Sequence, residues 1–130
     1  MQKAKLAMSV LVLLLAGYAY AAGSMPAGVQ TQKTSAGATV LADSKGMTLY
    51  TFGKDAAGKS NCNGKCAMAW PPLSATADDK DTGDWTVVTR DDGSKQWAYK
   101  GAPLYTFVKD AKAGDATGDG MGGNWHIATP

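Results

Sequence analysis

Two cysteines are the most reactive side chains that the sequence places close together. Cys62 and Cys66 are the only cysteines in the chain of 130 residues. In an oxidising compartment an even pair predicts a disulfide bond, and a loop this short adds about 2 kcal/mol of stability. The alternative is a redox-active thiol pair, although thioredoxin-like sites use the spacing C-x-x-C at a helix N-terminus. Attachment of a c-type haem requires C-x-x-C-H, which the sequence lacks.

A single histidine, His126, limits the metal chemistry that the side chains could support. One imidazole excludes zinc sites built from several histidines of one chain. Copper is an alternative, because Met121 lies five residues before His126 and thioethers are soft ligands. Further methionines stand at Met25, Met47 and Met68. Their spacing matches no established copper motif, and a solvent-facing histidine in a terminal strand explains the same residues.

A glycine-rich segment with three aspartates offers oxygen ligands for calcium. Residues 110–123 read DAKAGDATGDGMGG and contain Asp110, Asp115 and Asp119. Their spacing differs from that of an EF-hand, and the chain has no glutamate to act as the closing bidentate ligand. Aspartates that cap backbone amides in turns account for the same pattern. We therefore predict no cofactor, with copper or calcium as the alternative.

No group of residues in the sequence predicts an enzyme. His126 has no serine or cysteine neighbour in a nucleophile motif. The paired carboxylates at residues 78–79 and 91–92 fall in predicted loops, where solvent keeps them ionised. An acid, a base and an oxyanion site do not come together.

The N-terminus predicts export. Lys3 and Lys5 precede an apolar run over residues 6–15, and small residues follow, so we expect a signal peptide over residues 1–21 with cleavage near Ala21. Where a bacterial lipoprotein has its acylated cysteine, this chain has Tyr18, which excludes lipid attachment there. The apolar run is shorter than the roughly 20 residues of a stable membrane span. The expected location is the periplasm or the exterior of the cell.

The mature chain is expected to be electrically neutral. The chain has 13 basic and 11 acidic residues, and cleavage removes two lysines, which leaves 11 of each sign. A neutral protein has no long-range field with which to attract nucleic acid, so we expect no nucleic-acid partner. We expect a monomer.

The sequence predicts that short strands position these candidate functional residues. Runs rich in Val, Thr, Tyr, Phe and Trp alternate with turn residues, which is typical of antiparallel β structure. We predict a flexible leader over residues 22–38 and one β domain over 39–130, a small antiparallel sheet or barrel-like fold of two related halves, about 39–72 and 85–130. The predicted strands are residues 39–42, 47–52, 85–90, 95–99, 104–108 and 124–128, and a short helical turn is predicted at 66–70.

A duplicated segment relates the two halves. Residues 45–56 read KGMTLYTFGKDA and residues 100–111 read KGAPLYTFVKDA, with nine of twelve positions identical. Asp55 and Asp110 follow the predicted strands, where a carboxylate can accept hydrogen bonds from turn amides. We interpret these copies as structural.

The aromatic residues of each copy share one face of an extended strand. Side chains alternate along a strand, so Tyr50 and Phe52 point one way, and Tyr105 and Phe107 do the same in the second copy. We expect the two strands to pair around an approximate twofold axis, with both aromatic pairs covering the same core.

The combined motifs resemble a bacterial secreted-repeat family, described as predicted lipoproteins with a Tyr-x-(Phe/Trp/Tyr)-x-x-Asp motif. The resemblance covers about residues 39–130 and implies an exported protein whose activity is unassigned. Tyr18 departs from the lipoprotein pattern. The matching features are YTFGKD, YTFVKD, Cys62, Cys66, the WPP of 70–72, the QWAYKG of 96–101, the GD of 114–115 and the GGNWH of 122–126.

We expect a non-catalytic envelope protein that binds an unknown protein or envelope ligand or has a structural role. The alternative is a periplasmic metal-binding or electron-transfer accessory protein. The four tryptophans and the tyrosines fit either a packed core or a set of exposed rings. Exposed rings could bind sugars or peptides, or could relay electrons between partners.

Overall fold

Short antiparallel strands form almost all of the regular structure. The computed structural model describes residues 25–130, and the predicted signal peptide lies outside them. The described part has three sheets, β1–β2, β3–β7 and β4–β5–β6, which do not close into a barrel. The strands are β1 (Val29–Lys33), β2 (Thr39–Asp43), β3 (Tyr50–Phe52), β4 (Trp85–Thr89), β5 (Lys95–Tyr99), β6 (Ala102–Pro103) and β7 (Trp125–Ile127).

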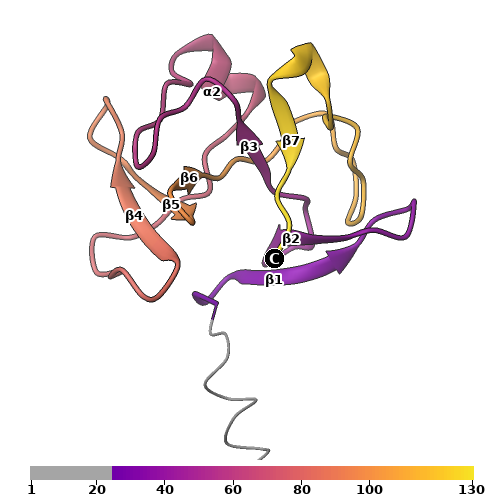
Figure 1. Ribbon diagram of the computed structural model, residues 1–130, viewed down its shortest axis with the longest axis horizontal. Helices are drawn as coiled ribbons and strands as arrows, with labels where there is room; N and C mark the ends of the chain where they lie inside the picture. Colours follow the sequence, from indigo (N-terminus) through magenta and orange to yellow (C-terminus); the bar gives the residue numbers. More distant parts are fainter. Residues whose placement is uncertain (1–24) are drawn as a thin grey trace, which may run out of the picture.

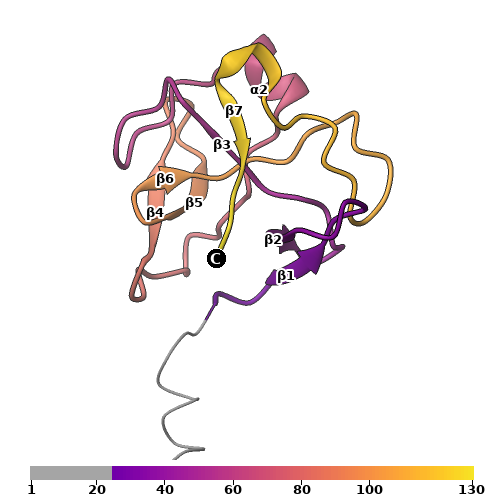
Figure 2. The same ribbon diagram turned by 45° about the vertical axis from the view of Figure 1, so that its right-hand side comes forward.

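The predicted fold class is confirmed. The structure is mainly β, and its short helix α2 (Lys65–Ala69) lies where a helical turn was expected. One 3-10 turn, η1 (Met121–Gly123), precedes β7. Figures 1 and 2 show β3 and β7 side by side, with the β4–β5–β6 sheet to the left and the β1–β2 hairpin below. No helix of the described residues is both long enough and apolar enough to cross a membrane.

The prediction of a flexible leader over residues 22–38 is wrong at Val29–Lys33, which form the strand β1. All five residues of β1 pair with β2, from Val29 opposite Asp43 to Lys33 opposite Thr39. The sequence of β1, VQTQK, contains one strongly apolar residue, and the strand stays largely exposed. Backbone pairing to the buried β2 holds this strand, so the hydrophobic pattern used to predict strands could not reveal it.

The two repeated segments meet around an approximate twofold axis, as expected. The Tyr50 N–H donates to the Tyr105 carbonyl (2.8 Å), and the Tyr105 N–H donates to the Tyr50 carbonyl (3.0 Å). Both tyrosines are fully buried. Each half of the chain therefore places its own motif against the motif of the other half.

Each half also supplies its last extended segment to the other half. β7, from the second half, pairs with β3 of the first. The segment after α2 returns this contact, because Leu73 N–H donates to the Leu104 carbonyl (2.8 Å) and Thr106 N–H donates to the Pro71 carbonyl (2.8 Å). The halves are interlocked, so neither has its full set of backbone partners alone.

The predicted strand at 104–108 forms only isolated bridges. Tyr105 pairs with Tyr50 on one side and with Pro72 on the other. Pro71 and Pro72 have no N–H to donate, so the ladder cannot extend as it does between β3 and β7. Residues 105–107 thus have the same sequence as β3 but form less regular structure, because they pair with a different partner.

Alternation along the repeated segments divides the interior into two clusters. The side chains on one face join the first cluster, which contains Leu41, Leu49, Trp85, Trp97, Leu104 and Ala128. The motif aromatics occupy the other face and join the second cluster, which contains Tyr50, Cys62, Trp70, Tyr105, Phe107 and Trp125, with Phe52 packed at its edge. The expectation that both aromatic pairs cover one core is confirmed for this second cluster.

Candidate functional site at the junction of the repeats

The motif tyrosines and aspartates are paired across the two repeats. The Tyr50 hydroxyl donates to Oδ2 of Asp110 (2.7 Å), and the Tyr105 hydroxyl donates to Oδ2 of Asp55 (2.7 Å). The other oxygen of each carboxylate accepts a backbone N–H, from residue 117 for Asp110 (2.9 Å) and from residue 61 for Asp55 (2.7 Å). The amide capping predicted for both aspartates is confirmed. The exchange of tyrosine partners was not predicted.

These contacts hold the pKa of both phenols above its usual value. Burial, together with the bond to Asp55, raises the pKa of Tyr105 to about 12. Burial likewise raises the pKa of Tyr50, and the bond to Asp110 adds to this effect. Burial also raises the pKa of Asp55, against the opposing effects of its hydrogen bonds. Near neutral pH the two tyrosines are therefore hydrogen-bond donors.

Four aromatic rings stack beside these pairs, in the order Phe52, Trp125, Trp70 and Phe107. The ring centroids of Trp70 and Trp125 are 3.8 Å apart, with 3° between the planes. Phe52 stacks on Trp125 at 4.2 Å, and Phe107 stacks on Trp70 at 4.1 Å. We call this array the aromatic stack. Its order follows the twofold relation, because each tryptophan lies next to the phenylalanine of the other half.

The two motif tyrosines contact the aromatic stack edge-on. The ring centroid of Tyr50 is 5.2 Å from that of Trp70, and Tyr105 is at the same distance from Trp125. Edge-to-face contact is a favourable arrangement for aromatic pairs. Gly118 closes one side, where a Cβ would lie only 2.5 Å from Trp70, and its N–H donates to the Tyr50 hydroxyl (3.2 Å). Any larger residue at this position would displace the tryptophan.

A buried arginine supports the Tyr105 side. The Arg90 guanidinium is buried and donates to Oγ of Ser60 (2.8 Å), to Oε1 of Gln96 (2.8 Å) and to the Cys62 carbonyl (2.6 Å). Ser60 Oγ also lies 2.6 Å from the Tyr105 hydroxyl, so hydrogen bonds connect the cation to the Tyr105–Asp55 pair. We did not predict this network. The sequence nevertheless contains a feature that could have indicated a buried arginine. Arg90 is the only arginine beside twelve lysines, and arginine suits buried multidentate sites better than lysine.

The predicted disulfide is confirmed. Cys62 and Cys66 are bonded, with their Cα atoms 5.2 Å apart. Cys62 is fully buried in the second cluster, and its carbonyl accepts a hydrogen bond from Arg90. The bond shapes the loop that leads into α2 beside the Tyr105–Asp55 pair.

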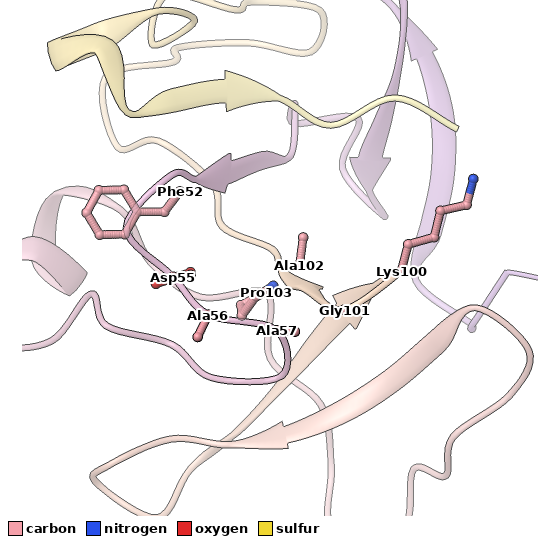
Figure 3. Close-up of a pocket in the computed structure, with 8 residues that line it drawn as sticks. All are labelled: Phe52, Asp55, Ala56, Ala57, Lys100, Gly101, Ala102 and Pro103. Atoms are coloured by element: carbon pink, nitrogen blue, oxygen red, sulfur yellow. The ribbon is translucent and has the colours of Figure 1, made fainter.

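A shallow pocket of about 230 Å³ lies beside Asp55, where the two repeats meet. We call it the junction pocket. Figure 3 shows that the first repeat contributes a loop and the second contributes the start of its motif, with the Lys100 side chain pointing away from the other labelled residues. The lining residues are Phe52, Asp55, Ala56, Ala57, Lys100, Gly101, Ala102 and Pro103.

The equivalent position in the second repeat is covered by its own loop. Phe107 and Asp110 are 5% and 6% exposed, whereas Phe52 and Asp55 are only half-buried. The amide donor lies seven positions after Asp110, compared with six positions after Asp55. The longer loop packs on the start of the first motif, where Thr48 Oγ1 donates to the carbonyl of residue 115 (2.6 Å).

The structure does not bring the five candidate metal ligands together. His126 is exposed on β7, and Met121 is 43% exposed in η1. Asp110 is buried and bonded to a tyrosine, while Asp115 and Asp119 accept backbone N–H groups. Within residues 25–130, no group of three or more His, Cys, Asp or Glu side chains is arranged to hold a metal ion.

The comparisons with known proteins place both interlocked halves in one family model. A model described as a secreted repeat of unknown function matches residues 30–74 and 86–129. Each match contains one copy of the motif, and the first begins inside β1. No curated protein and no solved structure matches the chain.

Proposed function

We propose that this chain, which belongs to the family of secreted repeats of unknown function, is an exported, non-catalytic module that binds a small ligand in the junction pocket. The difference between the two copies of the motif carries this proposal. The same residue types are sealed in one copy and open to solvent in the other. Since the aspartate of each copy bonds to the tyrosine of the other copy whether it is sealed or open, the fold itself does not require the opening.

A strained turn at the edge of the pocket supports a role for the open copy. Lys100 has φ 51°, and among the described residues no other non-glycine residue has a positive φ. A left-handed conformation costs such a residue about 1 to 2 kcal/mol. Strain of this kind is concentrated at functional sites.

The polar groups around the pocket favour binding over catalysis. Both oxygens of Asp55 already accept hydrogen bonds, and Tyr105 stays protonated near neutral pH. In the described part of the chain, every buried side-chain nitrogen or oxygen has a hydrogen-bond partner. The Asp55 carboxylate and the Tyr105 phenol are thus already paired with each other, whereas a carboxylate beside an aromatic face can still accept a donor from a ligand.

The lining defines the chemical class of the ligand. The half-buried ring of Phe52 offers an apolar surface, and Asp55 offers a hydrogen-bond acceptor with negative charge. A ligand with a flat ring and a hydrogen-bond donor, neutral or cationic, satisfies both groups. An anionic ring of the same size would meet the carboxylate unfavourably.

NMR titration of the ¹⁵N-labelled protein tests this assignment. Benzamidine is the probe, and benzoate is the control with the opposite charge. We expect benzamidine to shift the amide signals of residues 52–57 and 100–102, and Asp55→Asn to weaken the effect. Asp79→Asn, at a loop carboxylate that is half-buried like Asp55 but does not line the pocket, is the matched control and should leave binding unchanged. Equal shifts with benzoate, or no shift at millimolar benzamidine, would refute the proposal.

The location and the processing of the chain form part of the same proposal. We place the mature protein in the periplasm or outside the cell, as a monomer that begins after Ala21. Mass spectrometry of the exported protein should give the mass of residues 22–130, and size-exclusion chromatography with light scattering should give one chain per particle. An intact N-terminus or an acylated product would contradict this assignment.

A further inference from the structure

The aromatic stack contains two electron-rich rings in close face-to-face contact. Trp70 and Trp125 overlap with centroids 3.8 Å apart and planes 3° from parallel. Indole loses one electron more readily than the benzene ring of phenylalanine, and two overlapping indoles share the resulting positive charge. Both tryptophans are 6% exposed, so only an edge of each reaches solvent. The tryptophan pair is therefore the natural first site of electron loss in this cluster.

Each tryptophan contacts a tyrosine that can pass on the charge. Tyr50 meets Trp70 and Tyr105 meets Trp125, both at 5.2 Å between ring centroids. A phenol that loses an electron becomes a strong acid and must release its proton. Each hydroxyl already donates to a carboxylate at 2.7 Å, so the proton acceptor is in place. Oxidation of either tyrosine needs no proton transfer to solvent.

The surrounding charges favour Tyr50 over Tyr105. Burial is the main cause of the raised pKa of Tyr50, but the carboxylates of Asp110 and Asp119 both contribute to it. Near Tyr105, the Arg90 cation acts against the charge of Asp55. Proton transfer from a tyrosine neutralises the carboxylate that accepts the proton. At Tyr50 this removes the buried negative charge of Asp110, which is favourable. At Tyr105 it would remove the negative charge of Asp55 and leave the Arg90 cation without its counter-charge. Electron loss is thus more favourable at Tyr50.

We propose that the protein accepts one-electron oxidising equivalents at the Trp70–Trp125 pair and stores them as a neutral radical on Tyr50. The oxidant is an outer-sphere one-electron acceptor in the cell envelope, such as an organic radical or a high-valent metal complex. It takes one electron from the tryptophan pair and is itself reduced. Tyr50 then returns an electron to the pair and transfers its phenolic proton to Asp110. The products are a neutral tryptophan pair, a neutral tyrosyl radical and a protonated carboxylic acid.

This activity is independent of ligand binding, because it uses the sealed Tyr50–Asp110 pair, which joins the two copies of the motif. Asp110 and Tyr50 do not line the junction pocket, whereas Asp55 does. Flash photolysis can test it, with a ruthenium(III) polypyridyl complex generated in the light pulse as the oxidant. Transient absorption separates tryptophan from tyrosyl radicals, and freeze-quench electron paramagnetic resonance confirms the neutral tyrosyl species.

Matched variants of the two halves decide where the radical resides. Tyr50→Phe should remove most of the tyrosyl signal and prolong the tryptophan radical, whereas Tyr105→Phe and Tyr99→Phe should leave the signal largely intact. Asp110→Asn should slow tyrosyl formation, and Asp55→Asn should not. An unchanged yield in Tyr50→Phe, or equal losses in the two halves, would overturn the proposal. Circular dichroism of each variant verifies that it is folded.

A measurement on the unmutated protein keeps the test valid if a variant fails to fold. Because Asp110 is an internal base, the rate of tyrosyl formation should not depend on the concentration of imidazole buffer. A solvent-exposed tyrosine would transfer its proton to buffer, and its rate would rise with the base concentration. A linear rise in the folded protein would therefore exclude transfer to Asp110.

Discussion

Truncating the two motif phenylalanines should have very different costs, although the sequence makes them equivalent. Phe107 is 5% exposed and lies between the face of Trp70, at 4.1 Å, and the edge of Tyr50, at 6.3 Å. A Cβ built at Gly118 would lie 3.0 Å from the Phe107 ring, so this side is also filled. Phe52 stacks on Trp125 at 4.2 Å, but it is only half-buried and lines the junction pocket.

The expected magnitudes follow from this difference in packing. Phe107→Ala leaves a cavity between rigid rings that cannot collapse, and such changes cost about 3 to 5 kcal/mol. Phe52→Ala opens a space that water can enter, and the loss of about half of a phenylalanine's burial costs about 1 to 2 kcal/mol. We therefore expect a difference of about 2 kcal/mol or more between the two variants.

Urea unfolding monitored by tryptophan fluorescence and circular dichroism measures both free energies. With a slope of about 1 kcal/mol/M, the midpoints of the two variants should differ by about 2 M. The slopes of the variants should agree with that of the unmutated protein, so that the comparison reports on stability alone. Equal losses would show that the two rings are equally buried, and the asymmetry on which the junction pocket depends would then be wrong.

Three further predictions concern the polar interior and the metal candidates. Stability should fall between pH 10 and about 12, because Tyr105 keeps its proton up to a pKa of about 12 when folded and loses it near pH 10 when unfolded. The effect is roughly 2 to 3 kcal/mol, and urea curves of Tyr105→Phe that show the same pH dependence would refute it. Arg90→Met should cost about 3 kcal/mol by leaving buried acceptors unpaired, and a loss below about 1 kcal/mol in urea would contradict the network. Neither copper nor calcium should raise the melting temperature, and a copper shift that His126→Ala abolishes would reverse this expectation.

Local sequence patterns predicted most of the fold because most strands can be recognised from their own residues and the turns beside them. β4 and β5 flank a turn rich in aspartate and glycine, and their alternating residues predict a hairpin. The duplicated segment predicted paired strands and a shared aromatic core. β1 escaped prediction because its pairing with β2, rather than any burial of its own, holds it in place.

The partners of the motif residues could not be read from the sequence. A carboxylate five residues after a tyrosine could bond within its own repeat or across to the other, and only the twofold arrangement selects the exchange seen for Tyr50 and Asp110. The partners of Arg90 were equally hidden, because the residue ends a predicted strand and precedes two aspartates. Its actual partners, Ser60 and Gln96, come from other parts of the chain.

One twofold framework thus carries two electrostatically different sites. The Tyr105–Asp55 pair is half-open and linked to a buried cation, while the Tyr50–Asp110 pair is sealed and surrounded by negative charge. If the junction pocket binds ligand and the sealed Tyr50–Asp110 pair stores the radical, Asp55→Asn should weaken benzamidine binding and leave radical formation intact, and Asp110→Asn should do the reverse. Because the backbones of the two halves are interlocked, a variant that simply loosened the packing would weaken both ligand binding and radical formation. If each variant impairs only one of these two activities, each site acts through its own charges.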